Sequence, residues 1–134
     1  MTQHLLTITL ALTGLALTAI GLNTTLGGMY TLGWQFPPEV ASLTDPENHA
    51  RHDSNARFLA GVFTGMGLFM ALSAFVPKLR IVTCAFLIAV ALGAIMRLFQ
   101  PGYSPLADMA LLPSLIAELI GAPLLAFWIK RAER

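Results

Sequence analysis

The sequence predicts an all-α, membrane-spanning four-helix bundle that occupies a single domain, residues 1–134. Hydrophobic residues make up 56% of the chain and charged residues only 11%, whereas about a quarter of an ordinary soluble domain is charged. Four stretches are continuously apolar over roughly the 20 residues that a helix needs to cross a bilayer. A membrane β-barrel would alternate apolar and polar residues, so helices are favoured. The net charge of +1 argues against a nucleic-acid partner, which requires a basic surface.

The expected spans are residues 5–26, 58–76, 79–99 and 106–129, with one long external connection over residues 29–55. No Lys or Arg precedes the first span, and its apolar stretch is longer than a signal-peptide core, so we interpret it as a retained helix. Within the connection, Thr44-Asp45-Pro46-Glu47 is typical of a helix start, with a capping side chain followed by Pro. The second helix is therefore predicted to begin near Pro46 and to project beyond the bilayer.

Basic residues predict the orientation of the spans, because Lys and Arg are preferentially retained on the cytoplasmic side. More of them fall on the side of the chain termini than on the side of the long connection. We therefore expect both termini in the cytoplasm, with a bacterial inner membrane as the location. The residues on the side of the termini are Lys78, Arg80, Lys130, Arg131 and Arg134, and those on the other side are Arg51, Arg57 and Arg97.

Small residues recur at alternating spacings of four and three along the spans. Such residues let helices approach closely in lipid, and a period near 3.5 predicts a left-handed bundle. Gly61 and Gly65 give the second span an additional small face. The main stripes are Thr7, Ala11, Gly14, Thr18, Gly21 and Thr25 in the first span, Ala60, Thr64, Gly67, Ala71 and Ala74 in the second, and Ala110, Ser114, Ala117 and Gly121 in the fourth.

Glu118 lies near the middle of the fourth span, where an acid is costly and is turned inward, paired or protonated. Pro113 and Pro123 flank it, and because each removes a backbone hydrogen bond, we expect the bundle to widen around the acid. Arg97 is the candidate partner. At a rise of 1.5 Å per residue the two backbones should differ in depth by about 12 Å, which favours a water-bridged pair over a direct one. Glu118 could carry a proton, act as a general acid or base, bind a cation, or join helices structurally.

Two histidines and an acid in the connection form the candidate metal site. On a helix, His49 and Asp53 lie one turn apart with His52 beside them, and this ligand set suits zinc or iron. The sequence has no second histidine motif, so a solvated polar segment is favoured over a metal site. The one cysteine, Cys84, lies inside the third span and is expected to be inert. The sequence therefore requires no cofactor.

Several short motifs follow one another in order between Asp53 and the C-terminus. They are DSNARFLAG from Asp53, GMGL from Gly65, GAIMRL from Gly93, PGYSP from Pro101 and ELIG from Glu118. This part of the chain resembles the uncharacterised DUF4345 family of small four-helix membrane proteins, which the first span matches only in character. The residue before Arg97 is Met96, where the family pattern has Gly. The resemblance implies that Asn55, Arg57, Arg97 and Glu118 form a common polar cluster.

The sequence contains no nucleophile motif, phosphate-binding glycine loop or haem-attachment signature. We therefore expect a non-catalytic integral membrane protein, either an accessory subunit of a larger assembly or a homo-oligomer, in contact with membrane lipids and partner membrane proteins. The alternative is a binding protein or enzyme for an amphiphilic small molecule, such as a lipid or a quinone. In that case the cluster of Asn55, Arg57, Arg97 and Glu118 would hold the ligand between the helices.

Overall fold

The computed structural model describes residues 2–31, 46–99, 101–102, 104–109 and 111–133, and its regular elements over these residues are all helical. Four helices are long and apolar enough to cross a membrane: Gln3–Gly27, His49–Ser73, Pro77–Arg97 and Leu112–Ala132. Within the described residues, the all-α class and the four helices of membrane-spanning length are thus confirmed. Thr44, Asp45 and Arg134, used in the predictions above, lie outside the described residues.

The helical elements form two successive halves of the chain. The first half contains α1 (Thr2–Gly27), the 3₁₀ helix η1 (Gly28–Thr31) and α2 (Pro46–Ser73). The second half contains η2 (Pro77–Leu79), α3 (Arg80–Arg97), η3 (Pro105–Ala107), α4 (Leu112–Ile116), the π-helix η4 (Ala117–Gly121) and α5 (Ala122–Ala132). As predicted, the second helix begins at Pro46, so residues 46–55 of the expected external connection are helical.

The fourth membrane helix begins at Leu112 rather than near Leu106. Leu106 belongs to the short η3, and Asp108 after it has an extended backbone with φ −89° and ψ 104°, which ends the turn. Pro113 then occupies the first turn of α4, a position where its missing N–H breaks no helical hydrogen bond. The apolar Leu106 therefore belongs to a short 3₁₀ helix that precedes the spanning helix and not to the spanning helix itself.

The α1 and α2 helices pack through the predicted stripes of small residues. A Cβ built on Gly14 would lie 2.7 Å from the Gly67 carbonyl oxygen and 2.8 Å from the Ala71 Cα. A Cβ on Gly21 would lie 2.7 Å from the Thr64 backbone nitrogen. Because ordinary carbon contacts are about 3.5–4.0 Å, the two backbones approach closely only where these positions are glycine. We call α1 with α2 the first arm, and α3 with α4, η4 and α5 the second arm.

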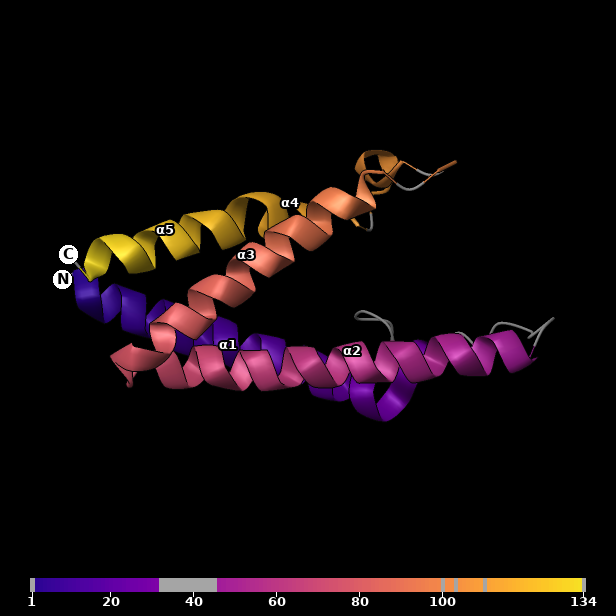
Figure 1. Cartoon of the computed structure of the whole chain (residues 1–134), viewed down its shortest axis with the longest axis horizontal. Helices are drawn as coiled ribbons and strands as arrows, with labels where there is room; N and C mark the ends of the chain where they lie inside the picture. The colour runs from indigo at the N-terminus through magenta and orange to yellow at the C-terminus, as the bar shows by residue number, and fades with distance from the viewer. Residues whose placement is uncertain (1, 32–45, 100, 103, 110, 134) are drawn as a thin grey trace.

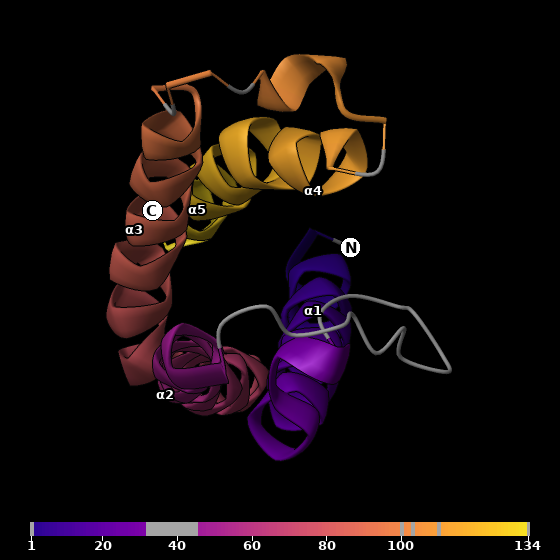
Figure 2. The same cartoon turned by 90° about the vertical axis from the view of Figure 1, so that its right-hand side faces the viewer.

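The two arms converge at one end of the molecule and diverge toward the other (Figures 1 and 2). The start of α1 and the end of α5 lie at the converging end, which we call the proximal end; the opposite end is the distal end. The shared apolar core is built from the proximal half of each arm. Its buried members are Leu6, Leu10, Met70, Ala74, Cys84, Phe86, Leu87, Ala122, Ala126 and Ile129.

Polar contacts reinforce the proximal end. The Gln3 side-chain amide donates to the Ala132 carbonyl over 2.6 Å and so joins α1 to α5. At the joint between the arms, the Arg80 side chain is buried and its Nε donates to the Ser73 carbonyl over 3.4 Å. This carbonyl belongs to the last residue of α2, where a helix leaves its acceptors unpaired.

Candidate functional site

At the distal end of the first arm, an Asp–Arg pair of α2 caps the end of α1. Asp53 and Arg57 lie one turn apart, and the Arg57 Nε donates to the Asp53 Oδ2 over 2.7 Å. The Arg57 Nη1 also donates to the carbonyls of Thr25 (3.0 Å) and Leu26 (2.7 Å). These carbonyls lack partners within α1, and a cation at a helix C-terminus complements the helix dipole. The pair therefore holds the distal ends of the two helices together.

Gly28 completes this cap. It follows α1 with a φ of 63°, a left-handed conformation that glycine adopts without steric cost and that commonly ends helices. The turn directs the Met29 backbone N–H to the Asp53 Oδ1 over 2.7 Å. A Cβ on Gly28 would lie 2.6 Å from the Arg57 Nη2. Glycine is therefore needed here both for the turn and for the close approach of the guanidinium.

A second ion pair joins the helices of the second arm. The Arg97 Nη1 lies 3.0 Å from the Glu118 Oε2, with 47% of the Arg97 side chain and 20% of the Glu118 side chain exposed. The pair is direct, so the expectation of a water bridge was wrong. Since the fourth helix begins at Leu112, Glu118 lies only about 9 Å along it at 1.5 Å per residue. The depth difference from Arg97, the last residue of α3, is correspondingly smaller.

Glu118 lies within a π-helical turn, Ala117–Gly121, between the two flanking prolines. The backbone N–H of Ala122 donates to the Ala117 carbonyl, five residues earlier. Pro123 has no N–H to give the Leu119 carbonyl in an α-helical pattern, and a π-turn is a local rearrangement that absorbs such a defect. The extra residue in this turn alters the direction of Glu118 relative to a regular helix.

The family to which the chain belongs is shown by a match over most of its length. The family model described as "Domain of unknown function (DUF4345)" matches residues 5–129. The chain belongs to the DUF4345 family. The match includes the first span, so the likeness extends beyond the part from Asp53 onward that the motifs indicate. No curated protein and no solved structure matches this chain.

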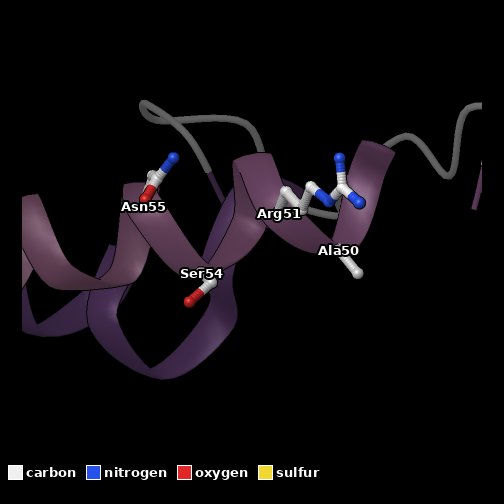
Figure 3. A pocket seen from close by; sticks show the side chains of 4 residues that line it. All are labelled: Ala50, Arg51, Ser54 and Asn55. Atoms are coloured by element: carbon white, nitrogen blue, oxygen red, sulfur yellow. The ribbon is translucent and has the colours of Figure 1, made fainter. Parts of the chain in front are cut away.

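In this DUF4345 protein, the four residues of the expected polar cluster lie in different local settings. Arg97 and Glu118 form one pair, whereas Arg57 is engaged with Asp53 and the end of α1. Asn55 is exposed on α2 and lines a shallow surface pocket together with Ala50, Arg51 and Ser54 (Figure 3). The side chains of these residues come from two turns of one helix, so the pocket does not connect the two ion pairs.

The candidate metal ligands form no coordinating group. Among the residues that the structure describes, no three His, Cys, Asp or Glu side chains are placed to hold a metal ion. Asp53 uses both carboxylate oxygens on Arg57 and Met29. The one carboxylate of the candidate ligand set is therefore already engaged. Two histidines that lie close in sequence do not by themselves make a metal site.

Arg80 is the polar residue of this DUF4345 chain whose role sequence reasoning missed. It was counted only as a charge that sets orientation, yet it is 6% exposed and contacts the end of α2. The signal in the sequence is its spacing of seven residues from Ser73, across the turn that follows α2. Arg57 and Arg80 each bond a helix C-terminal carbonyl, and Arg97 occupies the last turn of α3, so the three arginines share one electrostatic preference.

Proposed function

We propose that this DUF4345 protein is a non-catalytic membrane subunit that assembles with other transmembrane helices, in a homo-oligomer or with partner membrane proteins. The observation that carries this proposal is the unused small face of α2. A Cβ added to Gly61 or Gly65 would meet no atom within 4 Å, in contrast to Gly14, Gly21 and Gly67. A Gly-x-x-x-Gly pair lets a second helix approach closely in lipid.

The surroundings of this face support the same proposal. Phe58, Leu68 and Leu72 continue the spacing of the two glycines along α2, and all three are exposed. Between 22% and 28% of each of the four spans is buried within the chain, so most of the helix surface remains for lipid or partner helices. Large side chains beside two glycines form the ridge and groove that helix packing requires.

The experiment replaces the open face with bulk. We expect the Gly61→Leu/Gly65→Leu variant to lose its oligomeric or partner-bound state, measured by light scattering and by recovery of cross-linked species from native membranes. Gly93→Leu is the matched control, because Gly93 also lies in open space on another helix. A wild-type protein that is monomeric in lipid nanodiscs and recovers no membrane partner would refute the proposal.

A second candidate function is the binding of an amphiphilic small molecule, such as a lipid or a quinone, at the Arg97–Glu118 pair. The observation that favours it is the π-turn that carries Glu118, since such turns are frequent at functional sites. Lipids and quinones retained by the purified protein would be measured by mass spectrometry. Loss of a retained species in Glu118→Gln, but not in the control Glu133→Gln, would support this function, and equal retention would contradict it.

The side of the membrane also remains a proposal. The excess of basic residues toward the proximal end supports cytoplasmic termini in a bacterial inner membrane. The described basic residues toward that end are Lys78, Arg80, Lys130 and Arg131, and those toward the distal end are Arg51, Arg57 and Arg97. The left-handed crossing of the helices, expected from the 3.5-residue spacing of small residues, also stays a prediction.

A further inference from the structure

The two ends of the molecule are held together in different ways. At the proximal end, core residues of both arms are buried together, including Leu6 and Met70 of the first arm and Cys84 and Ile129 of the second. The Gln3–Ala132 hydrogen bond adds a polar contact between the arms at this end. Side-chain packing and hydrogen bonding therefore both resist separation of the arms there.

Toward the distal end, each of the two ion pairs between described residues lies within one arm. Asp53 and Arg57 bond to one another and to residues 25–29 of the same arm. Arg97 and Glu118 both belong to the second arm. These charged groups are paired inside their own arm, so separating the arms at this end breaks neither ion pair.

Apolar contact between the arms is also limited beyond the middle of the molecule. Phe63 of α2 and Phe86 of α3 make an edge-to-face ring contact with centroids 5.5 Å apart. Farther toward the distal end, Phe58 and Leu59 of the first arm and Met96 of the second arm are more than half exposed. Lipid chains are as apolar as these side chains, so in a membrane no hydrophobic force draws such surfaces together.

We infer that the protein is a clamp, with two rigid arms that pivot on the proximal core and change their separation at the distal end. The α1–α2 contacts at Gly14, Gly21 and Gly67 make the first arm rigid, and the Arg97–Glu118 pair stiffens the distal part of the second. Helical arms that move about a packed contact are an established form of conformational change, and such motions take microseconds to milliseconds. The Phe63–Phe86 contact limits how far the arms separate.

Distances between spin labels test the clamp in lipid nanodiscs. All variants carry Cys84→Ala, which removes the one native cysteine, and unlabelled protein is added in excess so that only distances within one molecule are measured. The distal pair is Asn55→Cys with Met96→Cys, one position in each arm. The proximal pair is Phe75→Cys with Phe127→Cys, and the control within the first arm is Leu22→Cys with Asn55→Cys; these positions are exposed.

The clamp predicts a broad distribution of distances for the distal pair and narrow distributions for the other two pairs. Phe63→Ala should shift the distal distribution to longer distances and leave the proximal one unchanged, because it removes the ring contact that joins the arms part-way along. A distal distribution as narrow as the proximal one would overturn the inference. A broad distribution for the pair within the first arm would overturn it as well, because the arm itself would then not be rigid.

Discussion

Replacing Gly14 or Gly61 with alanine is the same chemical change, but we expect the two replacements to have opposite effects on the free energy of unfolding. Both glycines lie inside helices, and replacing a helical Gly with Ala stabilises a helix by about 0.8–1.0 kcal/mol. At Gly61 the new methyl group meets no atom within 4 Å. Within a single chain only the gain in helix propensity applies there, so we expect Gly61→Ala to raise the free energy of unfolding of the detergent-solubilised monomer.

At Gly14 the new methyl group overlaps the neighbouring backbone. Its Cβ would lie 2.7 Å from the Gly67 oxygen and 2.8 Å from the Ala71 Cα, about 1 Å inside ordinary contact distance. Backbone atoms cannot rotate away, so α1 and α2 must move apart along their packed stripes. Overpacking of this kind costs about 1–3 kcal/mol. After the gain in propensity, we expect Gly14→Ala to lower the free energy of unfolding by up to about 2 kcal/mol.

The one cysteine supplies the assay. Cys84 is buried in the shared core, so a thiol-reactive fluorophore reports its exposure as the protein unfolds on heating in detergent. A change of 1 kcal/mol shifts Tm by roughly 4 °C in a domain of this size. We therefore expect Tm to fall by up to about 8 °C for Gly14→Ala and to rise by about 3–4 °C for Gly61→Ala. Equal shifts of the same sign would refute the reasoning, because the two positions differ chiefly in what the methyl group meets.

Three further substitutions and one fusion follow from the geometry. Arg57→Lys keeps the charge but loses the planar guanidinium that reaches several acceptors, and should lower stability by about 1–2 kcal/mol in the same thermal assay; an unchanged Tm would contradict the cap. Glu118→Gln should cost less, about 1 kcal/mol or below, because Arg97 is nearly half exposed, and a larger loss would point to a buried structural role. Pro123→Ala restores a backbone N–H and should convert the π-turn to an α-turn. The coupling energy of Arg97 and Glu118, measured in a double-mutant cycle, should then be lost. An unchanged coupling energy would show that the ion pair does not depend on the π-turn. A fusion of alkaline phosphatase at Asp45 should be active in bacteria, and an inactive fusion would reverse the proposed orientation.

The helices and the small faces through which α1 and α2 pack could be predicted because their signals are local. Continuous apolar stretches specify spans by length, and the spacing of Gly14, Gly21 and Gly67 indicates which faces approach. The start of α2 at Pro46 also followed from nearby residues. In each case the physical cause lies within a few helical turns of the residues concerned.

The direct Arg97–Glu118 pair could not be predicted from the same kind of reasoning. The depth estimate assumed one regular helix from Leu106, whereas the extended backbone at Asp108 delays the helix to Leu112. Residues 106–111 contain apolar side chains that serve a helix or a loop equally well. The geometry of the pair thus depends on a loop conformation that hydropathy does not specify.

The divergence of the arms depends on contacts between segments distant in sequence, whereas Arg80 contacts Ser73, across the turn that follows α2. Charge alone does not show that Arg80 is buried and Lys78 exposed. Likewise, the stripe in the fourth span contains Ala117 and Gly121, but both fall in the π-turn. Regular spacing loses its meaning where the helical repeat changes, so the packing of that span had to come from the structure.

The unequal lengths of the two arms have a consequence for the surrounding bilayer. The 26 residues of α1 extend about 39 Å and are apolar over most of their length, whereas the 18 residues of α3 extend about 27 Å. In α2, residues 46–57 are mostly polar and lie before its apolar stretch. A typical hydrocarbon core is about 30 Å thick. In a thicker membrane, more of the first arm lies within the hydrocarbon, and the hydrocarbon extends beyond the ends of α3. In a thinner membrane, the first arm tilts before the second. Membrane thickness thus acts on one arm more than on the other, and can bias their relative tilt without any bound molecule.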